Sequence, residues 1–227
     1  MNLLLIGYGK TGSLVGDIAR ERGHNVRVVI EKDNPGCMAL APDKLKEIDV
    51  AIDFTSPHCV MANIEACARA GKNMVVGTTG WHDQIPRVRM LVEQSGTGFV
   101  FGANFSVGVN LFFEAARALG SAAAFGYEGH IVERHHIHKK DKPSGTAIAL
   151  NNVYREGGGS DVPIDSIREG EVMGDHILQL TSPNDTIMLS HSAKSRRGFA
   201  DGAVRAAEWI RDKKGFYDFK DIFRKMS

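Results

Sequence analysis

The pattern of apolar and polar positions divides the chain into two parts of different character. In the first hundred residues, short apolar runs typical of buried strands alternate with stretches in which apolar residues recur at helical spacing. The predicted strands are 3–7, 26–31, 49–54, 74–77 and 98–101. The predicted helices are 13–22 and 57–70. Because strands that alternate with helices form βαβ units, this part predicts a doubly wound parallel sheet with a ligand crevice at the carboxyl ends of its strands.

A different pattern begins after residue 104. It predicts helices at 106–119, 144–154 and 199–211. It predicts β-like segments at 129–134, 164–173, 175–180 and 186–191, and a polar tail follows the last helix. This succession is typical of an α+β domain whose mixed or antiparallel sheet has helices on one side. We therefore expect one domain over 1–103, completed by about 200–227, and a second domain over 104–199.

Composition excludes several classes of partner. Lys plus Arg number 28 against 27 Asp plus Glu, so no overall charge favours nucleic acid or an anionic membrane. No apolar run approaches the length of a bilayer span, and the run at 3–6 is too short for a signal peptide. The three cysteines form an odd set without a metal or redox motif, which favours a reduced, cytoplasmic protein.

A glycine motif follows the first predicted strand. Gly7, Gly9 and Gly12 fit G-x-G-x-x-G and open a helix, which is the context of a dinucleotide-binding loop. Glu31 ends the next predicted strand, where a carboxylate can bind the adenosine ribose, and Lys32 beside it could neutralise a 2′-phosphate. The motif therefore predicts NADH or NADPH as cofactor, without deciding between them. Two further turns, 53–57 and 76–81, follow strands and are expected to line the same crevice.

The segment 133–146 concentrates three histidines and three lysines in a nearly neutral protein. Histidine exchanges protons near neutral pH, and a Ser-Gly-Thr turn that opens a helix offers backbone N–H groups to an anion. The segment therefore favours a site for a small polyanion, with a solvated basic loop as the alternative. A metal site is disfavoured, because the lysines oppose a divalent cation and the expected carboxylate or thiolate ligands are missing from the pattern.

Four segments resemble the signature segments of the 4-hydroxy-tetrahydrodipicolinate reductase family, the dihydrodipicolinate reductases: 77–80, 103–110, 135–139 and 143–147. The similarity extends from the glycine loop to 195–204. The similarity covers nearly the whole chain, and few other families would carry the central pair of segments in this order. It implies a Rossmann-type dinucleotide domain with an inserted substrate-binding domain, and a homotetramer built through the sheet of that second domain. It also implies NADH- or NADPH-dependent reduction of a small cyclic dicarboxylate at ring C4, in lysine and diaminopimelate biosynthesis.

The resemblance also implies roles for particular residues. His135 is expected to exchange the proton, and Lys139 to act as a further proton donor that lowers the pKa of His135 by like-charge repulsion. His136, Lys139, Ser144, Gly145 and Thr146 are expected to bind the substrate. The expected dinucleotide-binding residues are Gly7, Tyr8, Gly9, Lys10, Thr11, Gly12, Glu31, Lys32, Gly77, Thr78, Thr79, Gly102, Ala103, Asn104 and Phe105.

Two alternatives stay open at this point. An amino-acid dehydrogenase of the aspartate dehydrogenase type would share the architecture but oxidise an open-chain substrate. A non-catalytic dinucleotide-sensing protein would bind the cofactor and turn over nothing.

Overall fold

The computed structural model of the chain describes residues 1–29, 40 and 42–226. The chain divides into two compact units: Met1–Val107 together with Arg197–Ser227, and Gly108–Arg196. The first unit is therefore assembled from both ends of the chain. We call it the nucleotide unit and the second the histidine unit.

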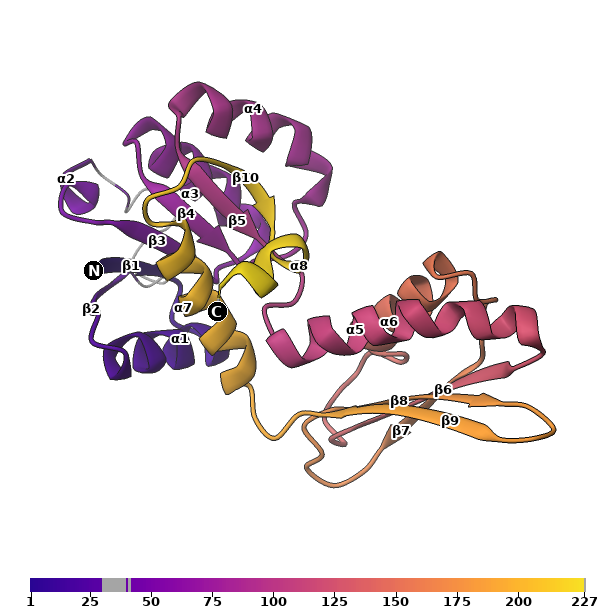
Figure 1. Cartoon of the computed structure of the whole chain (residues 1–227). Helices are drawn as coiled ribbons and strands as arrows, with labels where there is room; N and C mark the ends of the chain where they lie inside the picture. Colours follow the sequence, from indigo (N-terminus) through magenta and orange to yellow (C-terminus); the bar gives the residue numbers. More distant parts are fainter. Residues whose placement is uncertain (30–39, 41, 227) are drawn as a thin grey trace. The chain divides into compact units, whose positions relative to one another are not determined.

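The nucleotide unit contains a six-stranded parallel sheet with the order β10-β5-β4-β3-β1-β2 (Figure 1). The strands are β1 Asn2–Ile6, β2 Asn25–Val29, β3 Val50–Asp53, β4 Asn73–Val76, β5 Gly98–Phe101 and β10 Gly215–Asp218. The predicted parallel sheet is confirmed, but the prediction of a polar tail after the last long helix is wrong. Strand β10 has only four residues, and it forms through parallel pairing with the distant β5 rather than through a local apolar pattern.

Both faces of this sheet are covered by helices, so its strands are apolar on both sides. Alternate residues of β1 separate into two cores: Leu3 and Leu5 face one, and Leu4 and Ile6 face the other. The helices are α1 Lys10–Glu21, α2 Pro42–Leu45, α3 Pro57–Arg69, α4 Ile85–Ser95, α7 Arg197–Ile210 and α8 Phe219–Ile222. The crossover connections place the ends of β1, β3, β4 and β5 along one edge of the sheet, where a ligand crevice is expected.

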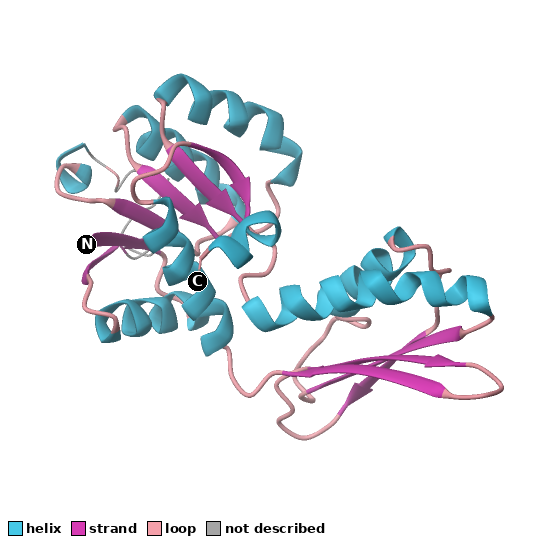
Figure 2. Ribbon diagram, in the orientation of Figure 1, coloured by secondary structure: helices cyan, strands magenta, loops and turns pink. Residues whose placement is uncertain are grey.

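The histidine unit contains a four-stranded sheet with the order β7-β6-β8-β9. Strand β6 pairs in parallel with β7 and antiparallel with β8, so the sheet is mixed, as predicted. Its strands and helices are β6 Glu128–His135, β7 Ile164–Arg168, β8 Asp175–Thr181, β9 Thr186–Ser192, α5 Val107–Leu119 and α6 Gly145–Glu156. Figure 2 shows both helices on the same side of the sheet. The opposite face carries exposed apolar side chains, among them Ile167 and Met188.

The predicted strand over 164–173 is shorter in the structure, because it ends at Arg168 and a turn follows. Among the cysteines, Cys67 is free and buried in the core of the nucleotide unit. Within the described part of the chain, no helix is long and apolar enough to cross a bilayer.

Candidate active site

The glycine loop between β1 and α1 leaves open space at the start of the helix. A Cβ atom on Gly7, whose φ is +89°, would lie 2.3 Å from the Phe54 carbonyl oxygen, and one on Gly12 would lie 2.3 Å from the Gly7 carbonyl oxygen. A side chain is therefore excluded at both positions. Gly9 is different, since it caps α1 and a Cβ there would meet nothing within 4 Å. The loop thus packs tightly against the protein at Gly7 and Gly12 and stays open to solvent at Gly9. This fits a pyrophosphate bound at a helix N-terminus.

A pocket of about 260 Å³ lies against this loop. It brings together three segments that the sequence placed in one crevice, and its lining residues are Gly9, Lys10, Thr11, Gly12, Phe54, Thr55, Gly77, Thr78 and Thr79. Gly77 has no room for a side chain, because a Cβ atom would lie 2.2 Å from the ring of Phe54. The close packing of the two turns at this point brings their backbones to the pocket wall.

A buried carboxyl group supports this wall from beneath. Asp53 is fully buried at the end of β3 and accepts hydrogen bonds from the Thr55 backbone N–H at 3.0 Å and the Thr55 hydroxyl at 2.8 Å. It also accepts from the Thr78 hydroxyl at 2.6 Å and from the Asn63 amide at 2.7 Å. Burial raises the pKa of Asp53, although these four donors oppose the shift. Asp53 therefore joins the two turns of the pocket without a charged partner among its donors.

Several expected dinucleotide-binding residues do not line this pocket. Gly7 lies beneath it, Tyr8 is 40% exposed, and Gly102 bonds the Val76 carbonyl through its N–H at 3.3 Å. Phe105 is a core residue, with its ring centroid 4.7 Å from that of Phe219. The side chain of Asn104 accepts a hydrogen bond from the Ser106 N–H at 2.9 Å, and Ala103 is exposed. The predictions for Glu31 and Lys32 lie outside the described residues.

The second cluster lies within the histidine unit, where β6 ends. Because strand residues alternate between faces, Ile131, Glu133 and His135 all point to the helix-covered side and are buried. The strand ends at His135, so His136 and His138 belong to the following turn, and their rings lie 6.1 Å apart. Of the three clustered histidines, only His135 is therefore held by the strand itself.

Glu133 is the centre of this cluster and is fully buried. Its carboxylate is bonded to His135 Nδ1 and accepts two hydrogen bonds from the Arg168 guanidinium, at 2.8 and 3.0 Å. The backbone N–H of Ser144 approaches it at 3.3 Å. Burial alone would raise the pKa of Glu133, but the bonds from Arg168, Ser166 and His135 outweigh burial and lower it to about 2. Glu133 is therefore a stable buried carboxylate.

His135 has one nitrogen bound and the other open. Nδ1 is bonded to Glu133, whereas Nε2 has no hydrogen-bond partner among the described residues and is not buried. Gly174 lies beside Nε2, and a Cβ atom there would come within 2.9 Å of it. Burial lowers the pKa of His135 most, Glu133 opposes this, and Lys139 and Arg168 add smaller lowering effects. The effect of Lys139 on this pKa thus has the predicted direction, but burial is the larger cause.

Helix α6 begins beside this pair. Ser144 caps it by accepting a hydrogen bond from the Ala147 N–H at 3.1 Å, and the Ser144 hydroxyl lies 3.0 Å from His176 Nε2. The N–H groups of Gly145 and Thr146 make no hydrogen bond within the described part of the chain. A Cβ atom on Gly145 would meet nothing within 4 Å. The helix start therefore offers two backbone donors and open space, as the sequence predicted.

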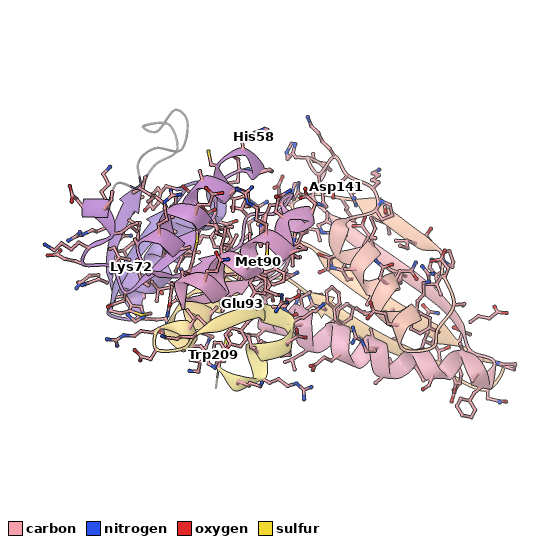
Figure 3. The ribbon with its side chains drawn as sticks, turned by 90° about the horizontal axis from the view of Figure 1, so that it is seen from above. His58, Lys72, Met90, Glu93, Asp141 and Trp209 are labelled. Atoms are coloured by element: carbon pink, nitrogen blue, oxygen red, sulfur yellow. The ribbon has the colours of Figure 1, made fainter. Side chains whose placement is uncertain are left out.

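Lys139 lies in the loop after β6, and its Nζ is 2.8 Å from a carboxylate oxygen of Asp141, which Figure 3 labels. Arg168 holds this loop, because its guanidinium donates to the carbonyl oxygens of Lys139 and Asp141. His136 is half-buried, and its Nδ1 is buried without a hydrogen-bond partner among the described residues. An unpaired polar atom at this position is consistent with a bound anion or water.

Three residues of this site were missed in the sequence: Glu133, Arg168 and His176. Arg168 and His176 come from β7 and β8, and only the pairing of those strands with β6 brings them to His135. The rings of His135 and His176 lie 5.1 Å apart, and burial lowers the pKa of His176 to about 4. The alternation of β6 could have indicated Glu133, since Glu133 and His135 lie two apart on one strand face.

Glu133, His135 and His176 also form a group whose potential ligand atoms lie within 4.8 Å of one another. A carboxylate ligand, missing from the sequence pattern around the histidines, is therefore present. Both oxygens of Glu133 are already bonded to Arg168, and a cation bound here would face that guanidinium. The arrangement suits proton exchange beside an anion site better than metal binding.

Comparison with known proteins identifies relatives over nearly the whole chain. The family model "Dihydrodipicolinate reductase, N-terminus" matches residues 1–105, and "Dihydrodipicolinate reductase, C-terminus" matches residues 108–223. The 4-hydroxy-tetrahydrodipicolinate reductase of Christiangramia forsetii is 37% identical, covering 98% of this chain and 97% of the relative. The enzyme of the same name from Laribacter hongkongensis is also 37% identical, covering 78% of this chain and 74% of the relative.

Solved structures show the same fold. The dipicolinate-bound dihydrodipicolinate reductase from Paenisporosarcina sp. superposes with a TM-score of 0.80 at 22% identity, covering 98% of this chain and 99% of that one. The aspartate dehydrogenase from Thermotoga maritima gives a TM-score of 0.52 at 15% identity, covering 94% of this chain and 97% of that one.

Proposed function

This chain belongs to the dihydrodipicolinate reductase family, and from that premise we propose that its reaction uses His135 as proton donor and the start of α6 as carboxylate site. It is an NAD(P)H-dependent oxidoreductase, a 4-hydroxy-tetrahydrodipicolinate reductase of lysine and diaminopimelate biosynthesis. The aspartate dehydrogenase alternative shares only the architecture, at 15% identity. A named reductase is 37% identical over nearly the full length of this chain, which also disfavours the alternative of a non-catalytic dinucleotide sensor.

The observation that carries the proposal is the open Nε2 of His135, whose other ring nitrogen is bonded to the carboxylate that also accepts the Ser144 N–H at the start of α6. When bound, the dinucleotide supplies a hydride to ring C4 of the substrate. The substrate's C4 hydroxyl first leaves as water, together with a proton from the neighbouring carbon, which conjugates C4 with the ring imine. Hydride addition at C4 then creates electron density in the ring, and a proton on the neighbouring carbon quenches it. His135 delivers this proton from Nε2, with Nδ1 held by Glu133. Lys139 lies in the loop that follows β6 and serves as a further proton donor.

The substrate carries two carboxylates, which require positive charge and hydrogen-bond donors. The N–H groups of Gly145 and Thr146, with the Ser144 cap beside them, bind one carboxylate at the positive end of α6. His136 and Lys139 bind the substrate from the loop after β6. The dipicolinate bound to the Paenisporosarcina relative is a cyclic dicarboxylate of the same class, which supports this assignment.

The dinucleotide binds against the glycine loop, with Gly7, Gly9 and Gly12 as the cradle and Thr78 and Thr79 at the adjoining wall. We propose that both NADH and NADPH serve, with at most a modest preference. Glu31 would accept hydrogen bonds from the ribose hydroxyls of NADH, and Lys32 would pair with the 2′-phosphate of NADPH. Lys32→Ala should weaken NADPH by about 1 kcal/mol, the size of an exposed ion pair, and leave NADH unchanged. Unchanged NADPH affinity in this variant would show that Lys32 plays no part.

The assembly proposed is a homotetramer formed through the open face of the mixed sheet. That face carries Ile167, 37% exposed, and Met188, 63% exposed, and a second copy could cover both. Analytical ultracentrifugation should give the mass of four chains, and a stable monomer would contradict the proposal. We also place the enzyme in the cytoplasm, where its reduced cofactor is available. Fractionation of cells that express the native chain tests this location.

A coupled assay tests the function directly. The cyclic substrate is produced enzymatically and offered with NADH and with NADPH in turn, while oxidation of the cofactor is followed by absorbance. We expect turnover with both cofactors. Turnover of L-aspartate instead, or dinucleotide binding without turnover of either substrate, would contradict a 4-hydroxy-tetrahydrodipicolinate reductase.

A further inference from the structure

The structure points to a positioning role for two residues of the histidine unit. We propose that Glu133 holds His135 in the tautomer that leaves Nε2 to exchange the proton, and that Arg168 holds Glu133 in place as a carboxylate. The inference rests on the proposed role of His135 as proton donor. Glu133 and Arg168 act through His135 and need no contact with the substrate.

The geometry specifies which nitrogen is which. A carboxylate only accepts hydrogen bonds, so a ring nitrogen bonded to Glu133 must carry a hydrogen. Nδ1 is therefore protonated in both the neutral and the charged ring, and only Nε2 gains or loses a proton. The absence of a side chain at Gly174 keeps space beside Nε2. A histidine oriented in this way by a buried carboxylate resembles the arrangement that serves other proton-transferring histidines.

Arg168 keeps Glu133, the main competitor for the proton, in its ionised form. Its two bonds to the carboxylate, at 2.8 and 3.0 Å, engage both oxygens of Glu133, and its side chain is 7% exposed. A bidentate pair of this kind is strong and directional. Without it, the proton could pass from His135 to Glu133 and be lost to the reaction. The low pKa of Glu133, about 2, agrees with this role but follows from the same contacts.

The same carboxylate also connects the proton donor to the anion site. Ser144 donates its backbone N–H to Glu133 at 3.3 Å and caps α6 with its hydroxyl. One buried group thus sets the position of His135 and of the helix start together. Proton transfer depends strongly on distance and angle. Because Glu133 contacts both His135 and the start of α6, it fixes the proton donor and the carboxylate site relative to each other.

The pairing of His135 with Glu133 fixes the sign of a pH dependence. The charged and titratable groups that face His135 are Glu133 on β6, Arg168 on β7, His176 on β8 and Lys139 in the loop. Of these, only Glu133 favours the protonated ring. Removing its charge must lower the pKa of His135, so the pH above which kcat falls must move to lower pH. A residue with a purely structural role would not move this limit.

The test compares Glu133→Gln with Glu128→Gln, an exposed control on the same strand. Glu133→Gln should lower kcat by about a hundredfold, since a misoriented histidine loses most of its proton-transfer advantage. Its alkaline limit should move down by about one pH unit. In a His135→Ala background, Glu133→Gln should have no further effect on kcat. An unmoved limit, or a full additional loss in that background, would overturn the inference.

A second measurement observes the wild-type chain and needs no substrate. Nitrogen-15 NMR of its histidine rings, assigned by comparison with His135→Ala, should show His135 protonated at Nδ1 when neutral. A neutral ring protonated at Nε2 would overturn the inference. If the wild type fails to turn over the cyclic substrate, the proposed function fails, whereas the tautomer result still stands or falls separately.

Discussion

Each unit of the molecule contains a fully buried carboxyl group beneath its candidate site, and the two groups have opposite surroundings. Asp53 in the nucleotide unit accepts hydrogen bonds from two threonines and an asparagine, all uncharged, and its pKa is raised by burial. Glu133 in the histidine unit is paired with Arg168 and His135, and these partners with Ser166 lower its pKa despite burial.

The difference corresponds to two kinds of work. In the nucleotide unit, Asp53 only has to hold two turns together at the pocket wall, and its donors are uncharged. The histidine unit must keep a proton on a chosen nitrogen, so it needs a carboxylate that stays ionised. Uncharged donors suffice for the first task, and a cation is required for the second.

The largest expected effect is on His135. His135→Ala should lower kcat by about a hundredfold or more, because a positioned proton donor is lost, while the dinucleotide dissociation constant stays unchanged. Steady-state kinetics and a binding titration measure the two quantities separately. The control is His138→Ala, since the side chain of His138 is 73% exposed. Near-normal turnover of His135→Ala would remove His135 from the mechanism.

Gly9→Val should act on the nucleotide unit alone. The added side chain enters open space, so the fold should be kept, but it fills the approach to the start of α1. We expect the dinucleotide dissociation constant to rise by about tenfold or more, equivalent to about 1.4 kcal/mol. Thermal unfolding should show a transition temperature close to that of the wild type. Unaltered dinucleotide binding in a folded Gly9→Val variant would place the pyrophosphate elsewhere.

Gly145→Val is the matched change in the histidine unit, since a side chain there also enters open space. It should raise the substrate KM by about tenfold while dinucleotide binding is unchanged, because only the carboxylate loses its donors. Initial rates at varied substrate give the first quantity and fluorescence titration the second. Equal weakening of both ligands would show that the turn is structural and that the anion site lies elsewhere.

The smallest effect is expected for Asp53→Asn. The buried Asn63 carbonyl oxygen has no partner among the described residues, so rotation of the Asn63 amide would pair it with the new side-chain NH₂. The dinucleotide dissociation constant should therefore change by less than about threefold. Isothermal titration measures it, with Asp53→Ala as the disruptive counterpart. A rise of about a hundredfold in the dinucleotide dissociation constant, as large as the kcat loss expected for Glu133→Gln, would contradict the contrast between the two carboxyl groups.

The two units also differ in how far the sequence predicts them. The parallel sheet and most of the pocket followed from local patterns, because glycines and strand ends are read directly along the chain. Strand β10 could not be predicted, since its four residues form a strand only against β5. Glu31 and Lys32 remain predictions from the sequence.

In the histidine unit, the sequence identified the histidine cluster and the helix start, but not the network beneath them. Arg168 lies 35 residues from Glu133 along the chain, and His176 lies 32 residues from Ser144. Their contacts depend on the pairing of three strands, which no local pattern reveals. Likewise, a lysine close in sequence to His135 suggested the cause of its lowered pKa, whereas burial is the larger cause.

The most direct test of the contrast is a titration of the two carboxyl groups. Carbon-13 NMR of the labelled Asp and Glu side chains, assigned through Asp53→Asn and Glu133→Gln, follows both from neutral pH down to about pH 3. Glu133 should stay ionised over this range, whereas Asp53 should take up its proton above the usual aspartate pKa of 3.8. A Glu133 carboxyl that titrates at or above 4.5, or an Asp53 carboxyl that titrates below 3.8, would contradict the account.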